Sequence, residues 1–157
     1  MTFEMKPIGV VSTARRRPGD DYWGGEQSCI TLAREFPPDA LVSLDAFSHV
    51  EVIFVFHLVE PSEIITGMRR PRNNPDWPAT GIFAQRGRNR PNRIGCTICP
   101  IERVTERTLY VRELDAIDGT PVLDLKPVMM EFLPRIRVAQ PPWASALMQH
   151  YWSSAAK

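Results

Sequence analysis

The chain has 157 residues, of which 43% are hydrophobic and 24% charged, so it fits one globular domain with a sizeable buried core. Its fifteen prolines exclude a bundle of long helices, because proline interrupts helices and is tolerated in loops and edge strands. A net charge of only +1 gives the protein as a whole no general affinity for polyanions.

β-branched residues and turn punctuation predict seven strands along the chain. They are expected at residues 6–13, 28–32, 49–58, 81–86, 95–104, 108–114 and 122–126. The third is the clearest, because one of its faces carries only apolar side chains: Val50, Val52, Phe54, Phe56 and Leu58. Its opposite face also turns apolar at residues 53–55, which predicts a strand covered on both sides, as in a barrel wall or a subunit interface.

Helical segments are few. One short helix is expected at residues 38–44, and near the C-terminus Pro142 suits a first helical turn, after which Trp143, Leu147 and Tyr151 recur on one stripe. Residues 67–78, rich in proline and asparagine, predict a long loop, which in a small domain is usually functional or disordered. We therefore predict a mostly β, single-domain antiparallel β-barrel over residues 1–157, with short helices at its periphery and a C-terminal helical extension at 140–153.

The three cysteines form no plausible disulfide framework, and no stretch resembles a signal peptide or a membrane span. These features predict a cytoplasmic protein with reduced thiols and no membrane association. Cys96 and Cys99 have the spacing of a metal site, but two residues three apart in a strand face opposite sides. A zinc site would also need further ligands, so no metal is expected.

Positive charge is concentrated in one segment. Residues 69–93 contain seven arginines and a single acid, Asp76. Such asymmetry indicates a local anionic partner, although a solvated surface whose acids come from distant strands would look the same. Arginine offers fork-shaped donors suited to carboxylate or phosphate, and Asn92 offers both a donor and an acceptor for a base or ribose edge.

Two further blocks carry candidate chemistry, although the common enzyme signatures (a glycine-rich dinucleotide turn, a P-loop, a nucleophile elbow) are absent. Asp115, Asp118 and Asp124 cluster around a turn, with Lys126 near enough to neutralise one of them. They are candidates to accept from ribose hydroxyls, to act as a general base or to coordinate a metal, while Asp118 also suits a simple turn-forming role. His57, near the end of an apolar strand, is either a ligand contact or a hydrogen-bonded structural residue.

Taken together, these blocks resemble the TrmO (TsaA-like) family. The phrase from Gly81 to Arg86, followed by Arg90-Pro91-Asn92-x-Ile94-Gly95, is similar to its hallmark loop. Phe47-Ser48-His49 with the strand to Phe56-His57, and the stretch from Asp118 to Pro127, are similar to its other two motifs. The resemblance covers about residues 6–127 and is closest to the short, single-domain form.

This resemblance implies a small antiparallel β-barrel that is usually dimeric and binds S-adenosylmethionine. Family members methylate N6 of threonylcarbamoyladenosine in tRNA, so the expected enzyme is an S-adenosylmethionine-dependent tRNA methyltransferase. The cofactor pocket it implies is formed by His57, Leu58, Arg86, Cys96, Asp115, Ile117, Asp118, Gly119 and Thr120, with another wall at residues 23–27. Asp118 is the candidate catalytic base, and the candidate tRNA contacts are Arg70, Arg72, Arg88, Arg90, Asn92 and Lys126.

Two other functions remain open at this level. The near-neutral net charge suits a methyltransferase that acts on a small molecule. A non-catalytic sensor that binds S-adenosylmethionine and signals through its dimer interface would also carry these motifs.

Overall fold

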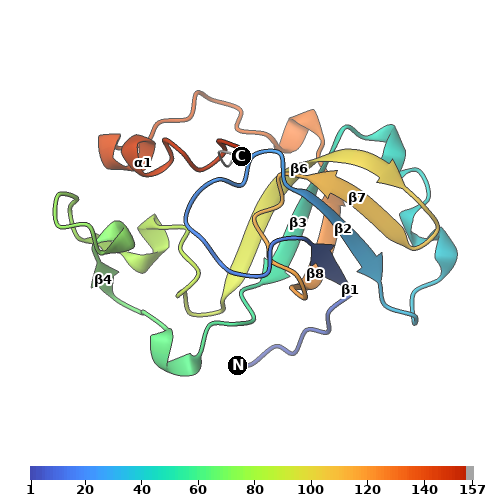
Figure 1. Cartoon of the computed structure of the whole chain (residues 1–157), viewed down its shortest axis with the longest axis horizontal. Coiled ribbons are helices and arrows are strands. Elements are labelled where there is room, and N and C mark those ends of the chain that lie inside the picture. The colour runs from blue at the N-terminus through green and yellow to red at the C-terminus, as the bar shows by residue number, and fades with distance from the viewer. Residues whose placement is uncertain (155–157) are drawn as a thin grey trace.

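Six antiparallel strands close into a barrel in the computed structural model, which describes residues 1–154 (Figure 1). The order around the barrel is β1-β2-β7-β6-β3-β8. The strands are β1 (Gly9–Thr13), β2 (Gln27–Leu32), β3 (His49–Val55), β6 (Ile94–Val104), β7 (Thr108–Arg112) and β8 (Pro121–Pro127). The predicted antiparallel barrel is confirmed.

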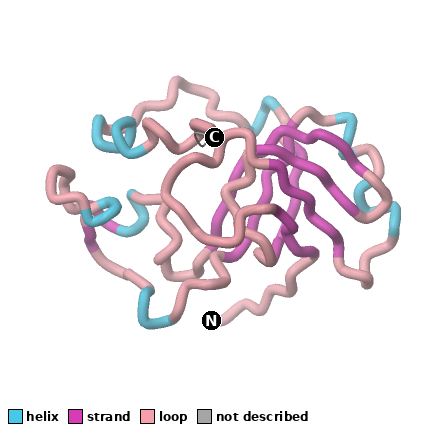
Figure 2. Tube along the Cα trace, viewed as in Figure 1, coloured by secondary structure: helices cyan, strands magenta, loops and turns pink. Residues whose placement is uncertain are grey.

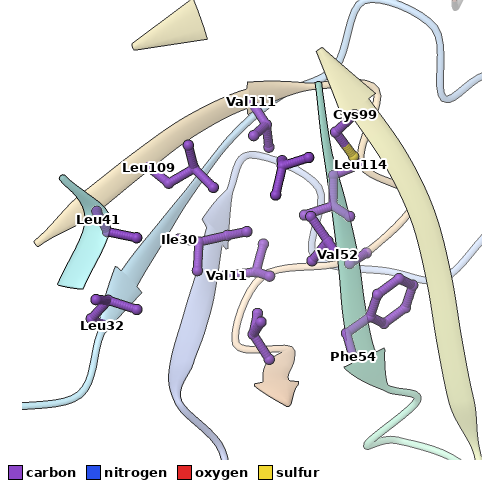
Figure 3. Close-up of a cluster of buried hydrophobic side chains, with 13 residues drawn as sticks. Val11, Ile30, Leu32, Leu41, Val52, Phe54, Cys99, Leu109, Val111 and Leu114 are labelled. Atoms are coloured by element: carbon purple, nitrogen blue, oxygen red, sulfur yellow. The ribbon is translucent and has the colours of Figure 1, made fainter. Parts of the chain in front are cut away.

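The barrel forms because side chains alternate between its interior and its outer surface. On β3, Val50, Val52 and Phe54 are buried, whereas the side chains between them are only partly covered. Inward positions on the other strands complete one core, together with Leu41, Leu114 and Ala116 from connecting segments (Figure 3). Closure leaves no free sheet edge within the barrel, which removes the hydrogen-bonding groups that an open sheet exposes.

Gly95 shows how tightly this interior is packed. It lies on β6 opposite Phe54, and a Cβ atom added to it would lie 2.4 Å from two carbons of the Phe54 ring. Glycine is therefore the residue that leaves room for the aromatic ring.

Outside the barrel, a two-stranded sheet pairs β4 (Met68–Arg69) with β5 (Thr80–Gly81). This small sheet belongs to residues 56–93, a long connection between β3 and β6 that we call the arm. Part of the predicted loop at 67–78 is therefore ordered structure, including a turn at Pro71–Asn73 in which Arg72 and Asn73 have positive φ angles of 51° and 56°.

Two strand predictions are wrong in part. The strand expected at 81–86 is a 3-10 turn, Ile82–Ala84, because the Gln85 N–H donates to the Ile82 carbonyl instead of to a neighbouring strand. The strand expected at 49–58 ends at Val55, since the Val59 N–H closes a turn on the Phe56 carbonyl. Leu58, expected on the buried face, is consequently 55% exposed.

The two predicted helical segments are also shorter or more broken in the structure than expected. The helix expected at 38–44 is two 3-10 turns, Pro38–Leu41 and Leu44–Ala46, separated by Ser43 in a left-handed conformation (φ 69°). A helix does form near the C-terminus, but α1 spans only Pro142–Leu147, so most of the helical extension expected at 140–153 is wrong. The chain continues after the helix without regular structure (Figure 2). Residues 148–154 lie along the connection between β1 and β2 (Figure 1). None of the helices within residues 1–154 is long and apolar enough to cross a lipid bilayer.

The antiparallel order brings three connections to the same end of the barrel. β1, β3 and β7 end there, and β2, β6 and β8 begin there. This end, which we call the site end, therefore carries residues 14–26, the arm, and residues 113–120. The C-terminal residues 148–154 also lie there (Figure 1).

Candidate functional site

The predicted cofactor residues converge on the site end. His57, Leu58 and Arg86 lie in the arm, and Asp115 and residues 117–120 follow β7. Cys96 is the third residue of β6, close to the start of that strand. The barrel topology thus brings together side chains that are up to 63 positions apart in the chain, as for His57 and Thr120.

Asp115 is the centre of this group. One of its carboxylate oxygens, Oδ1, accepts a hydrogen bond from the hydroxyl of Thr97, and the other, Oδ2, accepts one from the hydroxyl of Tyr151. Thr97 is buried on the inner face of β6, while Tyr151 comes from the C-terminal segment. The carboxylate is therefore fixed from two sides, with lone pairs left for a further donor.

Cys96 and Arg86 lie next to this centre. The Cys96 thiol donates to Glu51 Oε1 at 2.9 Å, and burial together with that carboxylate raises the pKa of Cys96 to about 12. The thiol is therefore protonated at neutral pH and does not serve as a nucleophile. Arg86 donates from Nη2 to the Cys96 carbonyl at 2.6 Å and forms no ion pair with any carboxylate within residues 1–154. Its exposed guanidinium is available to bind an anion.

The turn at 118–120 is held against β1. Thr13 donates its N–H to Asp118 Oδ1 at 3.1 Å, and the Asp118 N–H donates to the Arg15 carbonyl at 2.8 Å. Gly119 has a φ of 80°, and a Cβ atom there would lie 3.9 Å from His57 Nε2. His57 and this turn are therefore neighbours, while Asp118 remains exposed to solvent.

The arginines proposed as tRNA contacts have different surroundings. Arg72 forms a bidentate ion pair with Asp21, with both nitrogen–oxygen distances 2.8 Å, and also donates to the Asp20 carbonyl. The hydrogen bond to Asp21 raises the pKa of Arg72, so the pair joins the arm to residues 14–26 as a neutral unit. Arg70 donates to the Pro75 carbonyl at 3.2 Å and to the Trp77 carbonyl, and no acid within residues 1–154 pairs with it.

The other proposed contacts divide between two regions. Arg90 donates to the Gln85 carbonyl at 2.9 Å, and Arg88 and Asn92 are exposed in the same arm. Lys126 lies on β8, apart from the arm, where its ammonium group is 2.8 Å from Asp124. It lines an apolar groove of about 270 Å³ on the outer surface of the barrel.

The two cysteines of the metal-type spacing lie on opposite faces of β6, since Cys99 is buried in the core and Cys96 contacts Glu51 outside it. Within residues 1–154 no three His, Cys, Asp or Glu side chains are grouped so that they could hold a metal ion.

Four residues of the site were not predicted from the sequence. Thr97, Tyr151, Glu51 and Asp21 each contact a predicted residue through the fold. Tyr151 had a weak signal, because it lay at the end of the apolar stripe that predicted the C-terminal helix. The others occupy ordinary strand or loop positions and carry no local signal.

The chain is similar in sequence to several known proteins. Residues 16–132 match the family described as the tRNA-methyltransferase O N-terminal domain. The chain is 36% identical over 109 residues to the mouse tRNA (adenine(37)-N6)-methyltransferase, covering 68% of this chain and 25% of that protein. It is 34% identical over 131 residues to a probable S-adenosyl-L-methionine-binding protein of Methanothermobacter thermautotrophicus, covering 81% of this chain and 90% of that protein.

A solved structure of a family member has the same fold. The crystal structure of TrmO from Pseudomonas aeruginosa superposes with a TM-score of 0.71 at 28% identity, covering 92% of this chain and 63% of that one. The chain spans about a quarter of the mammalian relative's length. A family match over most of the chain, joined to the same barrel, shows that the protein belongs to the TrmO family.

Proposed function

We propose that this protein binds S-adenosylmethionine at the site end and transfers its methyl group to N6 of a modified adenosine, of the threonylcarbamoyladenosine type, in tRNA. One observation carries the proposal: three features meet at one end of the barrel. They are an arginine with no carboxylate partner among residues 1–154, a doubly hydrogen-bonded aspartate, and His57 beside the turn at Gly119. The mouse relative is named as a tRNA (adenine(37)-N6)-methyltransferase, and the archaeal relative as a probable S-adenosyl-L-methionine-binding protein.

The residues fit the chemical groups of this cofactor. Arg86, which has no carboxylate partner within the described chain, suits the methionyl carboxylate. Asp115 and the backbone of residues 117–120 suit the ribose hydroxyls. The buried indole N–H of Trp23 has no hydrogen-bond partner among residues 1–154, which supports a ligand-facing wall at residues 23–27. When bound, the cofactor supplies a methyl group activated on a sulfonium.

The protein's own part in the reaction is mainly orientation. Holding the acceptor nitrogen in line with the methyl group removes the entropic cost of bringing two reactants together. Asp118, exposed beside His57 and held by the Thr13 N–H, is the proposed group that takes the proton from the acceptor nitrogen.

Positive side chains of the arm suit the phosphate backbone of the acceptor. Arg70, Arg88 and Arg90 form no ion pair with an acid among the described residues, so no neighbouring carboxylate offsets their charge. Arg72 contributes less, since Asp21 neutralises it. Trp77, whose carbonyl is bonded by Arg70, lies in an open cleft with Trp143 and is placed to stack on an unpaired base.

A homodimer is part of the proposal. Met129, Phe132 and Leu133 line the groove beside Lys126, and Phe132 is 87% exposed. A contiguous apolar surface of this kind usually marks a protein interface. Phe132→Glu should then yield monomers in multi-angle light scattering, whereas Phe83→Glu in the arm should leave the dimer intact. A tRNA acceptor and reduced thiols would place the protein in the cytoplasm.

Calorimetric titration with S-adenosylmethionine tests the cofactor and its site. Loss of a charge-assisted contact costs about 1.5–3 kcal/mol, so Arg86→Ala should weaken binding by about 10- to 150-fold. Arg88→Ala, a neighbouring exposed arginine, should bind as the wild type does. Absence of binding to the wild-type protein would remove the cofactor assignment.

The acceptor requires a second experiment. Purified protein and labelled cofactor are added to tRNA from a strain lacking this protein, and in parallel to a metabolite extract. Label in tRNA supports the proposal, and label only in the metabolites indicates a small-molecule methyltransferase. Binding without transfer to either would indicate a sensor.

A further inference from the structure

The C-terminal segment 148–154 lies on the candidate cofactor site although it follows the part of the chain that matches the family. Tyr22 and Trp23 donate their N–H groups to the carbonyls of His150 and Tyr151, at 3.1 and 2.8 Å. The Gly24 N–H donates to the Ser153 carbonyl at 3.3 Å. Three successive backbone donors therefore hold this segment against the connection between β1 and β2.

Gly24 makes this close approach possible. A Cβ atom added to it would lie 2.0 Å from the Trp152 carbonyl oxygen, which is far inside any tolerated contact. The Tyr22 ring also stacks on the His150 ring, with 6.2 Å between the centroids. The position of the segment is thus determined by its backbone as well as by its side chains.

The docked segment delivers the hydroxyl of Tyr151 to Asp115. This hydroxyl donates to Oδ2 of Asp115, while Thr97 donates to Oδ1. Burial, the charge of Asp115 and this hydrogen bond raise the pKa of Tyr151, so the phenol stays a donor at neutral pH. Without it, the carboxylate would keep one fixed partner and regain rotational freedom about its terminal torsion.

We propose that Tyr151 is a positioning residue of the cofactor site, and that residues 148–154 form one of its walls. The inference rests on the proposed function, because it assumes that Asp115 receives hydroxyl donors of S-adenosylmethionine. The hydroxyls of Thr97 and Tyr151 each occupy one lone-pair site of the Asp115 carboxylate. Because these two bonds fix the carboxylate, its other lone pairs point in a fixed direction and can accept from the ligand. The ligand then binds a carboxylate that is already oriented.

The test is calorimetric titration of the full chain with S-adenosylmethionine, together with thermal melting of the ligand-free protein. Tyr151→Phe removes only the hydroxyl oxygen and should raise the Kd about tenfold, the usual effect of losing a hydrogen bond to a charged group. Gly24→Ala should raise the Kd as well, by displacing the segment without changing Tyr151 itself. The matched control is Tyr110→Phe, whose ring lies on the barrel surface against Arg103 and should leave the Kd unchanged.

A double-mutant comparison separates positioning from mere stability. In an Asp115→Asn background, Tyr151→Phe should add little further loss of affinity, because the two side chains act as one unit. In steady-state assays the KM for the cofactor should rise while kcat stays near that of the wild type.

A Kd for Tyr151→Phe within twofold of the wild type, or a tighter Kd, would overturn the inference. The inference would also be overturned if Tyr151→Phe lowered the affinity for the cofactor equally in the wild-type and the Asp115→Asn backgrounds. If the wild-type protein itself binds no cofactor, both the inference and the proposed function fail, and that failure is recognised because it does not depend on any variant.

Discussion

The substitution Gly95→Ala tests how the barrel interior is packed. The new Cβ atom would lie 2.4 Å from Cε2 and Cζ of Phe54 and 3.0 Å from Cδ2. Since normal contacts between carbon atoms begin near about 3.5 Å, the ring must move by about 1 Å. It has little room to do so, because Phe54 is 1% exposed and packs edge-on against Phe56 with 5.3 Å between ring centroids.

Overpacking of this kind costs about 1–3 kcal/mol. Replacing glycine by alanine also lowers the entropy of the unfolded chain, which favours folding by about 0.4–1 kcal/mol. The expected net loss in the free energy of unfolding is therefore about 1–2 kcal/mol. For a domain of this size that corresponds to a melting temperature lower by about 2–8 °C.

Urea unfolding followed by tryptophan fluorescence measures the effect. Gly87→Ala is the control, because a Cβ atom there meets nothing within 4 Å, and it should be neutral or slightly stabilising. Phe54→Leu should partly relieve the clash, so the double variant should lose less stability than the two single losses added together. Wild-type stability of Gly95→Ala alone would refute the packing argument.

Three further substitutions probe the site end. Asp115→Ala leaves two hydroxyl donors without their acceptor and should lower the free energy of unfolding by about 2 kcal/mol or more, measured by urea unfolding. Burial and Glu51 raise the pKa of Cys96 above its value in the unfolded chain, so stability should fall as pH rises from about 9 towards 12. Cys96→Ser should reduce that fall in melts at about pH 8 and about pH 10.5, and an unchanged pH dependence would contradict the reasoning. Asp21→Asn weakens the ion pair with Arg72 and should change the free energy of unfolding by no more than about 1 kcal/mol. It should nevertheless speed tryptic cleavage of the arm. Equal cleavage rates in the variant and the wild type would show that the pair does not hold the arm.

Local sequence patterns predicted the strands and turns correctly where a segment's structure depends mainly on residues close to it in the sequence. The alternation of Val50, Val52 and Phe54 predicted an inward strand face, and those three side chains are buried. The turn before β8 followed from Asp118-Gly119, and Gly119 adopts the positive φ of 80° that such a turn requires. Residues 81–86 looked like a strand by composition, yet Phe83 is 76% exposed because no barrel strand is available to pair with it.

Some features of the candidate site could be predicted from the sequence, and others depend on the fold. Its residue types were readable, since the arginine-rich loop and the aspartate turn are contiguous motifs. The sequence did not show which arginine would pair with an acid. Arg72 binds Asp21, 51 positions away, whereas Arg86 has no acidic partner within residues 1–154 and donates to the Cys96 carbonyl.

The sequence by itself determined the barrel class, the family and the chemical groups available for a cofactor, because these depend on periodicity and on contiguous motifs. Only the tertiary structure decided that Tyr151 leaves its predicted helix stripe and bonds Asp115, 36 positions away. That contact exists because backbone donors of residues 22–24 capture the C-terminal segment, and the pairing of segments distant in sequence leaves no local pattern in either of them.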